Sequence, residues 1–197
     1  FIKTCHGFDV GQFREGASFA QYEPVLRGMF PPPGQQPQAP QEVEGLQSSQ
    51  WVDLQQYDFN LHNLGEWVTI VPDPAASDQQ AARMPATHTQ WAIQYPVPGD
   101  LGQFGQWRCY VVARCDARVP SGNAFQIGLY DADSRRNVAG QTVTIEQSSG
   151  GAYHTFDLGT QHLKDGMYFW IAPMKNPDQV DAVYTDRIFL VRETPSQ

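Results

Sequence analysis

The sequence is poor in charged residues, and basic residues are the scarcer kind. Charged side chains make up 17% of the 197 residues, against about a quarter in ordinary globular domains. The 13 Lys and Arg residues are outnumbered by 21 Asp and Glu residues, which gives a net charge of -8. Because nucleic-acid binding depends on clustered Lys and Arg, we expect no nucleic-acid partner. The composition instead favours a neutral ligand, a cationic ligand or a metal-assisted site.

Long apolar runs and catalytic motifs are also absent from the sequence. No run approaches the length of about 20 apolar residues that crosses a bilayer, so we predict no membrane span. The GxSxG, HExxH, Walker and GxGxxG motifs do not occur. The five histidines show no paired spacing that is typical of metal ligands, and we interpret them as structural residues. We therefore predict that the chain is not an enzyme.

Cysteine is rare, with three residues at Cys5, Cys109 and Cys115. The last two lie in one apolar run that reads as a single strand. Six positions of a strand span about 20 Å, which is too far for a disulfide between them. Their even separation places both on one face of the strand and favours buried thiols. A pair with Cys5 would require the N-terminal segment to pack close by.

The first 45 residues differ in composition from the rest of the chain. Residues 31–41 read PPPGQQPQAPQ and predict an extended linker. Residues 17–29 have apolar side chains at roughly helical spacing, interrupted by Pro24, and are compatible with one or two short helices. We therefore divide the chain into an N-terminal extension and linker, residues 1–45, and a β domain, residues 46–197. Because the sequence starts at Phe1 rather than Met, we expect a processed product or a piece of a longer protein.

The remainder of the chain is a series of short β-strand patterns. Turn residues recur every 8–12 residues or so, and no segment with helical periodicity interrupts the series. This pattern predicts an all-β fold, and the number of strands favours a jelly-roll β-sandwich of two antiparallel sheets. The predicted strands are 51–60, 66–71, 80–84, 90–95, 107–115, 123–130, 138–145, 153–158, 167–173 and 180–192.

Aromatic residues at the ends of predicted strands suggest a ligand site. Trp107 follows the Gly-rich loop 99–105, and Tyr153 and His154 follow Ser-Ser-Gly-Gly at 148–151. Aromatic rings stack on the C–H face of a sugar, while amides and carboxylates bind its hydroxyls. We predict that these three residues face a ligand, although a tryptophan in a sandwich strand is more commonly part of the core.

The turn at residues 131–137, DADSRRN, offers polar groups to the same ligand. Arg135 and Asn137 are predicted to bind hydroxyls. The alternative is an ordinary solvated hairpin turn.

Three aspartates are candidate ligands for a structural Ca²⁺. Asp58 lies near the end of the first strand, Asp73 in the turn 71–78, and Asp186 in the middle of the last, otherwise apolar strand. The first and last strands of a jelly roll commonly run side by side, which would bring these oxygen ligands together. In the alternative interpretation, Asp73 and Asp78 only cap turns, and Asp186 pairs with Arg187 or another arginine.

The order of several short motifs resembles that of a known family. The motifs are Tyr57-Asp58-Phe59, Trp67-Val68, residues 73–84 (DPAASDQQAARM), Gln90-Trp91-Ala92, residues 153–159 (YHTFDLG), residues 167–170 (MYFW) and residues 184–188 (YTDRI). Together they resemble the jelly-roll carbohydrate-binding modules at the C-terminal end of bacterial secreted glycoside-hydrolase-like proteins, over residues 46–193. The resemblance implies a structural calcium held by Asp73 and Asp186, although Gln79 stands where relatives often have glycine. It also implies a secreted or cell-surface location.

The function that we expect from these observations is non-catalytic binding of a polysaccharide or oligosaccharide, which would hold a larger secreted glycosidase-like protein near its substrate. The alternative is a structural or docking β-sandwich that packs on an adjacent catalytic domain or another subunit without binding sugar. An exposed aromatic patch would favour the first function, and a broad apolar face would favour the second.

Overall fold

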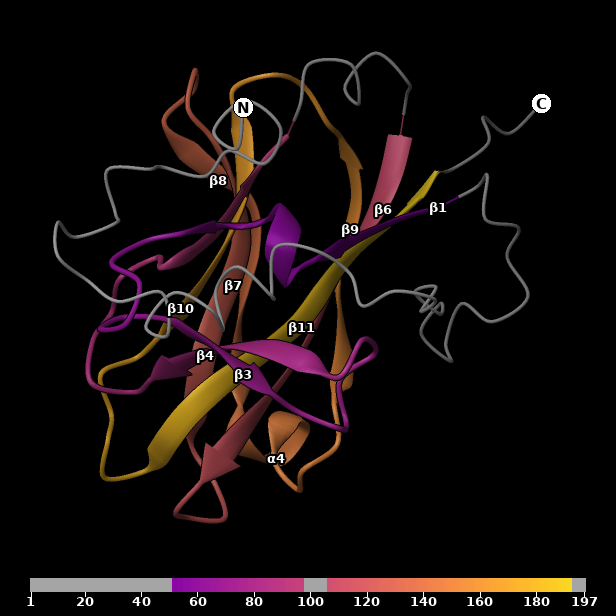
Figure 1. The fold of residues 1–197 in the computed structure, drawn as a ribbon. Coiled ribbons are helices and arrows are strands. Elements are labelled where there is room, and N and C mark those ends of the chain that lie inside the picture. Colours follow the sequence, from indigo (N-terminus) through magenta and orange to yellow (C-terminus); the bar gives the residue numbers. More distant parts are fainter. Residues whose placement is uncertain (1–50, 98–105, 193–197) are drawn as a thin grey trace, which may run out of the picture.

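The computed structural model describes residues 51–97 and 106–192, and these form a β-sandwich with a jelly-roll arrangement of strands (Figure 1). The fold class predicted from the sequence is confirmed. Sheet A has the order β3-β4-β11-β6-β9, with β1 also paired to β11. Its strands are β1 (Trp51–Gln55), β3 (Thr69–Pro72), β4 (Gln80–Pro85), β6 (Gln106–Ala117), β9 (His154–His162) and β11 (Val180–Arg192). Sheet B has the order β2-β5-β10-β7-β8. Its strands are β2 (Asn60–Leu61), β5 (Ile93–Pro96), β7 (Asn123–Asp131), β8 (Arg136–Thr144) and β10 (Met167–Pro173).

Strand β11 is the longest strand and organises sheet A. It pairs with β6 along most of its length, and its opposite edge is shared by β4 at Ala182–Thr185 and β1 at Arg187–Val191. Figure 1 shows β11 running diagonally across the sheet. A change of register against β6 lies between Thr185 and Arg187, beside the buried Asp186. The expectation that the first and last strands lie side by side is therefore confirmed.

Two local predictions were wrong. The run 51–60 is not one strand, because β1 ends at Gln55 and a 3-10 turn, η4 (Gln56–Asp58), carries the chain from sheet A to sheet B. A short helix, α4 (Ile145–Ser148), also follows β8 where we expected none. Each turn starts with a reciprocal capping pair, Gln55 with Asp58 and Thr144 with Gln147. Each capping pair satisfies free backbone N–H groups at the start of its turn.

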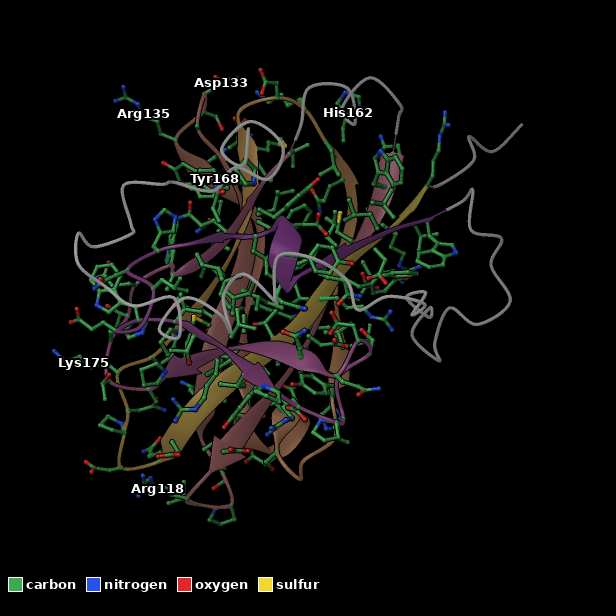
Figure 2. The ribbon with its side chains drawn as sticks, in the orientation of Figure 1. Arg118, Asp133, Arg135, His162, Tyr168 and Lys175 are labelled. Carbon is green, nitrogen blue, oxygen red and sulfur yellow. The ribbon has the colours of Figure 1, made fainter. Side chains whose placement is uncertain are left out.

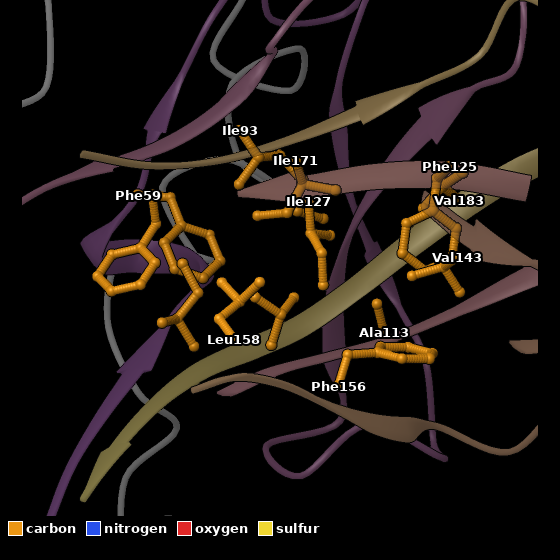
Figure 3. Close-up of a cluster of buried hydrophobic side chains, with 14 of the residues drawn as sticks. Phe59, Ile93, Ala113, Phe125, Ile127, Val143, Phe156, Leu158, Ile171 and Val183 are labelled. Atoms are coloured by element: carbon orange, nitrogen blue, oxygen red, sulfur yellow. The ribbon is translucent and has the colours of Figure 1, made fainter. Parts of the chain in front are cut away.

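The core lies between the two sheets, where alternating residues of each strand meet (Figure 3). Sheet B contributes Phe125, Ile127 and Leu129 from β7, and sheet A contributes Phe156 from β9, among others. The rings of Phe125 and Phe156 meet edge to face across the sandwich, with centroids 5.7 Å apart. Complete burial of such side chains contributes about 1.5–3 kcal/mol each to folding. This packing fixes which face of every strand points outward.

The two cysteines of β6 are buried free thiols, as their even separation predicted. Burial raises the pKa of both thiols, so they behave as small apolar groups rather than nucleophiles.

The N-terminal extension and linker (1–45), Cys5 and the loop 99–105 lie outside the described residues. Among the helices of the described ranges, none has the length and apolar character needed to cross a bilayer.

Candidate functional site

The outward face of sheet B carries a cluster of large aromatic side chains. On β10, Phe169 and Ile171 point into the core, so Tyr168 and Trp170, which alternate with them, point outward. On β7, Tyr130 lies beside Tyr168, with ring centroids 5.2 Å apart. Tyr168 and the tip of the β7–β8 hairpin lie toward the same end of the sandwich in Figure 2. The alternation of strand residues thus places three aromatic rings on one solvent-facing surface.

Trp170 lies flat across the neighbouring strand β7 because that strand has no side chain beneath it. Its register partner on β7 is Gly128. A Cβ atom at Gly128 would lie 2.6 Å from the indole ring, closer than any real contact. The indole Nε1–H reaches β8 and donates a hydrogen bond of 2.9 Å to Asn137 Oδ1. Trp170 is therefore fixed at both ends and retains only 5% of its exposure.

A second indole covers the first. Trp91 precedes β5, and its ring stacks on Trp170 with centroids 4.3 Å apart and planes 10° from parallel. Tyr130 and Tyr168 contact the edge of Trp91 at centroid distances of 5.6 and 6.2 Å. Gln94 Nε2 donates to the Trp91 carbonyl at 3.3 Å. We call Trp91 and Trp170 the indole pair, of which Trp91 is the more exposed member.

Two hollows flank the indole pair. The β8-side hollow, about 550 Å³, is lined by Trp170 and by residues of β7 and β8: Gln126, Ile127, Asn137, Val138, Ala139, Gly140, Gln141 and Thr142. The β5-side hollow, about 370 Å³, is lined by His62, Trp67, Thr89, Gln90, Trp91 and Gln94. Because β10 lies between β5 and β7 in sheet B, the hollows are on opposite sides of the pair. No Asp, Glu, Lys or Arg occurs among these lining residues.

This surface offers the groups that bind an uncharged ligand. Its rings offer flat apolar area, and its amides and hydroxyls donate and accept hydrogen bonds without charge. General acid–base hydrolysis of a glycoside needs two carboxyl groups that face each other across the bond. The described lining of the two hollows contains no carboxyl group.

Of the five residues predicted to bind a ligand, the structure places one, Asn137, against the indole pair. Asn137 holds Trp170 and lines the β8-side hollow. Arg135 is exposed at the tip of the β7–β8 hairpin, beside Asp133, where both project into solvent (Figure 2). The solvated turn that we considered as the alternative is what the structure shows for Arg135.

The prediction that Trp107 faces a ligand was wrong. Trp107 lies at the start of β6, is 5% exposed and belongs to the core. It is two residues before Cys109 and therefore shares the inward face of β6 with the buried thiols.

Tyr153 and His154 are likewise separate from the indole pair. Tyr153 donates its phenol O–H to Asp73 Oδ2 at 2.7 Å, on the outward face of sheet A. His154 begins β9 opposite Ala113 and is half-buried. Trp107 pairs instead with Gln161 near the other end of β9. These three residues do not form a common surface, and the prediction that Tyr153 and His154 face a ligand stays a prediction.

Asp73 is held by protein groups rather than placed as a free ligand. Its Oδ2 accepts hydrogen bonds from Arg114 Nη2 at 2.8 Å and from Tyr153, and its Oδ1 caps the turn at Ala75 N at 3.0 Å. The Arg114 guanidinium also lies 3.8 Å from the centre of the Tyr184 ring. Burial by itself raises the pKa of Asp73, but the bonds from Tyr153 and Arg114 outweigh burial and hold that pKa below its ordinary value.

Asp186 is buried and also has internal partners. Its Oδ1 accepts from Ser77 N at 3.0 Å and Ser77 Oγ at 2.8 Å, and its Oδ2 lies 3.7 Å from Arg187 Nε. Arg187 in turn donates to Asp53 Oδ2 at 3.1 Å. Burial raises the pKa of Asp186 to about 6, although Arg187 and Ser77 act in the opposite direction. Ser77 thus ties the β3–β4 turn to the middle of β11.

The predicted calcium ligands do not come together. Asp58 caps η4 by accepting from Gln55 N at 2.9 Å, whereas Asp73 and Asp186 belong to the two networks above. Over residues 51–97 and 106–192, no group of three or more His, Cys, Asp or Glu side chains is arranged to hold a metal ion. The three aspartates therefore do not fit a shared Ca²⁺. Arg114 and Arg187 supply the positive charge beside Asp73 and Asp186.

Sequence reasoning missed the residues that matter most here: Trp91, Trp170, Gly128, Tyr130 and Tyr168. The sequence did contain two signals for these residues. Tyr168 and Trp170 have the same parity in β10, and Gly128 is a glycine inside an otherwise bulky strand, which commonly marks a close approach.

Comparisons with known proteins return solved structures of similar fold. Neither a protein-family model nor a curated protein matches this sequence. The C-terminal CBM6 of LamC, a marine laminarinase from Zobellia galactanivorans, matches with a TM-score of 0.48 at 10% identity, over 72% of this chain and 99% of that one. The CBM22-1 xylan-binding domain of Xyn10C from Paenibacillus barcinonensis matches with a TM-score of 0.46 at 11% identity, over 75% and 89%. The C-terminal family 22 carbohydrate-binding module of Xyn10B from Clostridium thermocellum matches with a TM-score of 0.46 at 15% identity, over 84% and 100%. These likenesses concern the fold alone.

Proposed function

We propose that this domain is a non-catalytic carbohydrate-binding module that holds an uncharged polysaccharide on the outward face of sheet B. The observation that carries the proposal is the indole pair, with Trp91 outermost, placed between two hollows that are lined by amides and hydroxyls. The C–H face of a pyranose packs on an indole ring, and its hydroxyls need uncharged donors and acceptors nearby. Such a module would serve a larger secreted or cell-surface glycosidase-like protein.

The lining residues also bear on the class of sugar. Carboxylated or sulfated polymers are usually held by Arg or Lys, because their charges must be compensated on binding. The described linings of the two hollows contain uncharged amide side chains, such as those of Gln94, Gln126 and Asn137, and no Arg or Lys. The proposal is therefore specific for neutral polymers.

The indole pair is held in place by the protein itself, without a ligand. Trp170 is held by Asn137 and by its seat on Gly128, and Trp91 is held by Trp170 and Gln94. Rings that are already fixed lose little conformational freedom on binding, so a larger share of the stacking energy contributes to affinity. This arrangement supports recognition of a ligand that presents a flat apolar face.

The test is affinity electrophoresis of the chain in gels that contain β-glucan, xylan, galactomannan or the uronate polymer alginate. We expect retardation on at least one neutral polymer and none on alginate. Trp91→Ala should weaken binding about tenfold or more, because one stacking contact is lost. Trp51→Ala is the matched control: it removes the same side chain from sheet A, where Trp51 packs on Phe189.

Two results would overturn the proposal. Retardation that persists in Trp91→Ala would place the sugar elsewhere. If no neutral polymer retards the wild-type chain, the docking function expected as the alternative from the sequence would be favoured.

A further inference from the structure

A single histidine connects two of the residues that line the β5-side hollow. His88 lies in the segment between β4 and β5, and both of its ring nitrogens contact the backbone. Nδ1 accepts a hydrogen bond from Gln90 N at 3.1 Å, and Nε2 lies 3.0 Å from the carbonyl oxygen of Trp67. An amide N–H must donate and a carbonyl must accept. The ring is therefore the neutral tautomer with its proton on Nε2.

The two backbone partners of His88 come from two separate segments of the chain. Trp67 and Gln90 both line the β5-side hollow, and Gln90 is the residue directly before Trp91. The His88 ring also lies against the Trp67 indole, with centroids 5.9 Å apart. The carbonyl oxygen of His88 accepts from Lys175 N at 3.0 Å, which anchors the segment to the connection between β10 and β11. His88 thus fixes the segment that presents Trp91 to solvent.

We propose that neutral His88 is a positioning residue for the carbohydrate site, and that its protonation releases the Gln90–Trp91 segment and weakens sugar binding. This inference rests on the proposed function for its consequence, although the release itself does not depend on a sugar. A proton on Nδ1 would face the N–H of Gln90, and two donors cannot bond to each other. The N–H of Gln90 would lose its acceptor and would have to turn toward water. Because Gln90 O accepts from Ala92 N at 2.8 Å, the movement would include both neighbours of Trp91.

The surroundings of His88 determine the direction in which its pKa is shifted. Burial lowers the pKa of His88 below its ordinary value of 6.5, while the bond to Trp67 O and the charge of Glu66 act in the opposite direction more weakly. Glu66 is itself bound to Asn63 Nδ2 at 2.8 Å. Titratable groups on the packed segments also include His62, in the same hollow, and Lys175, whose side chain is on the molecular surface in Figure 2. A depressed pKa means that the bonded, neutral form is complete at neutral pH and is lost only as the pH falls below about 6.5.

The experiment follows Trp91 and sugar binding in parallel between about pH 7 and pH 5. NMR of the chain without ligand reports the tautomer of His88 and the indole N–H signal of Trp91. The sugar arm uses electrophoresis in the neutral polymer that retards the wild-type chain most. We expect the Trp91 signal to move with the titration of His88, and affinity to fall about tenfold or more once His88 is protonated.

The variants separate a positioning role from a merely structural one. In His88→Asn the side-chain oxygen still accepts from Gln90 N but does not titrate, so binding at neutral pH should persist and the acid loss should largely vanish. His162→Asn changes an exposed histidine of β9 and should leave the profile unchanged. An acid loss that survives in His88→Asn and disappears in His62→Asn would overturn the inference.

The two proposals fail in different ways. If the Trp91 signal does not respond while His88 titrates, the inference about His88 is wrong, whether or not sugar binds. If the signal responds but no polymer is bound at any pH, the proposed function is wrong and the coupling between His88 and Trp91 stands.

Discussion

Adding one methyl group at Gly128 tests whether the indole pair depends on a bare backbone beneath it. In Gly128→Ala the new Cβ would lie 2.6 Å from the Trp170 ring. Carbon atoms in contact keep about 3.5–4.0 Å, so the indole must withdraw by roughly 1 Å. The bond from Nε1 to Asn137 is 2.9 Å long, and this withdrawal would carry it beyond the usual hydrogen-bond range of about 3.2 Å.

The magnitude follows from three effects of this one displacement. Overpacking costs about 1–3 kcal/mol, the lost hydrogen bond about 1 kcal/mol, and the disturbed aromatic contacts about 0.5–1.5 kcal/mol. Because the three effects share one movement and are not additive, we expect a loss of about 2–4 kcal/mol in unfolding free energy. For a chain of this size each kcal/mol shifts the melting temperature by about 2–4 °C, so a fall of roughly 10 °C is expected.

Thermal melting, near-UV circular dichroism and polymer-gel electrophoresis together measure the result. Gly140→Ala is the control, because it adds the same Cβ on the adjacent strand β8. There the nearest atom is the Ile127 carbonyl oxygen at 3.1 Å, and no ring lies within 4 Å. The control should melt closer to the wild type and keep the aromatic dichroism. If Gly128→Ala melts like the wild type and migrates like it in polymer gels, Trp170 does not need the bare backbone at Gly128. The reasoning about the indole pair would then be wrong.

Two further predictions concern the buried aspartates. Because burial raises the pKa of Asp186 from 3.8 to about 6, the folded chain takes up this proton at a higher pH than the unfolded chain. The wild type should therefore gain stability relative to Asp186→Asn as the pH falls through that window, by about 3 kcal/mol at most. Urea unfolding at both ends of the window measures the gain, and a constant difference between the two proteins would contradict it. Removal of divalent cations with a chelator should leave the melting temperature unchanged, since Asp73 and Asp186 are bound to Arg114, Tyr153, Ser77 and Arg187. A fall that added calcium reverses would contradict this prediction and would favour the calcium site expected from the sequence.

The fold was predictable because turn signals and β-forming residues are local properties. The positions of β6, β7, β10 and β11 follow their apolar runs closely. The break at η4 was not predictable in the same way. There Gln55 and Asp58 form a capping pair inside what reads as a continuous strand, and tertiary packing decides between the two states.

The site was less predictable, because the side on which a residue faces depends on its partners. The parity of Trp107 with Cys109 was visible and would have placed it in the core. Trp170 lies in a run, MYFWIAP, that is apolar at every position and so gives no alternation to read. Trp91 lies outside any strand, and only its stacking partner shows that it belongs to the site. Strand periodicity carries no information about such a residue.

The position of β11 has a consequence for the order in which the chain folds. All five strands of sheet B precede β11 in the chain, whereas in sheet A strands β1, β4 and β6 all pair with β11. During synthesis these three pairings with β11 must wait until residues 180–192 have emerged, and the pairing of Trp51 with Val191 closes a loop of nearly the whole described chain. Non-local pairings of this kind slow folding and leave strand edges exposed in the meantime. We therefore expect sheet B to acquire its strands first and sheet A to be completed late, when β11 joins the pairs β3–β4 and β6–β9 and strand β1.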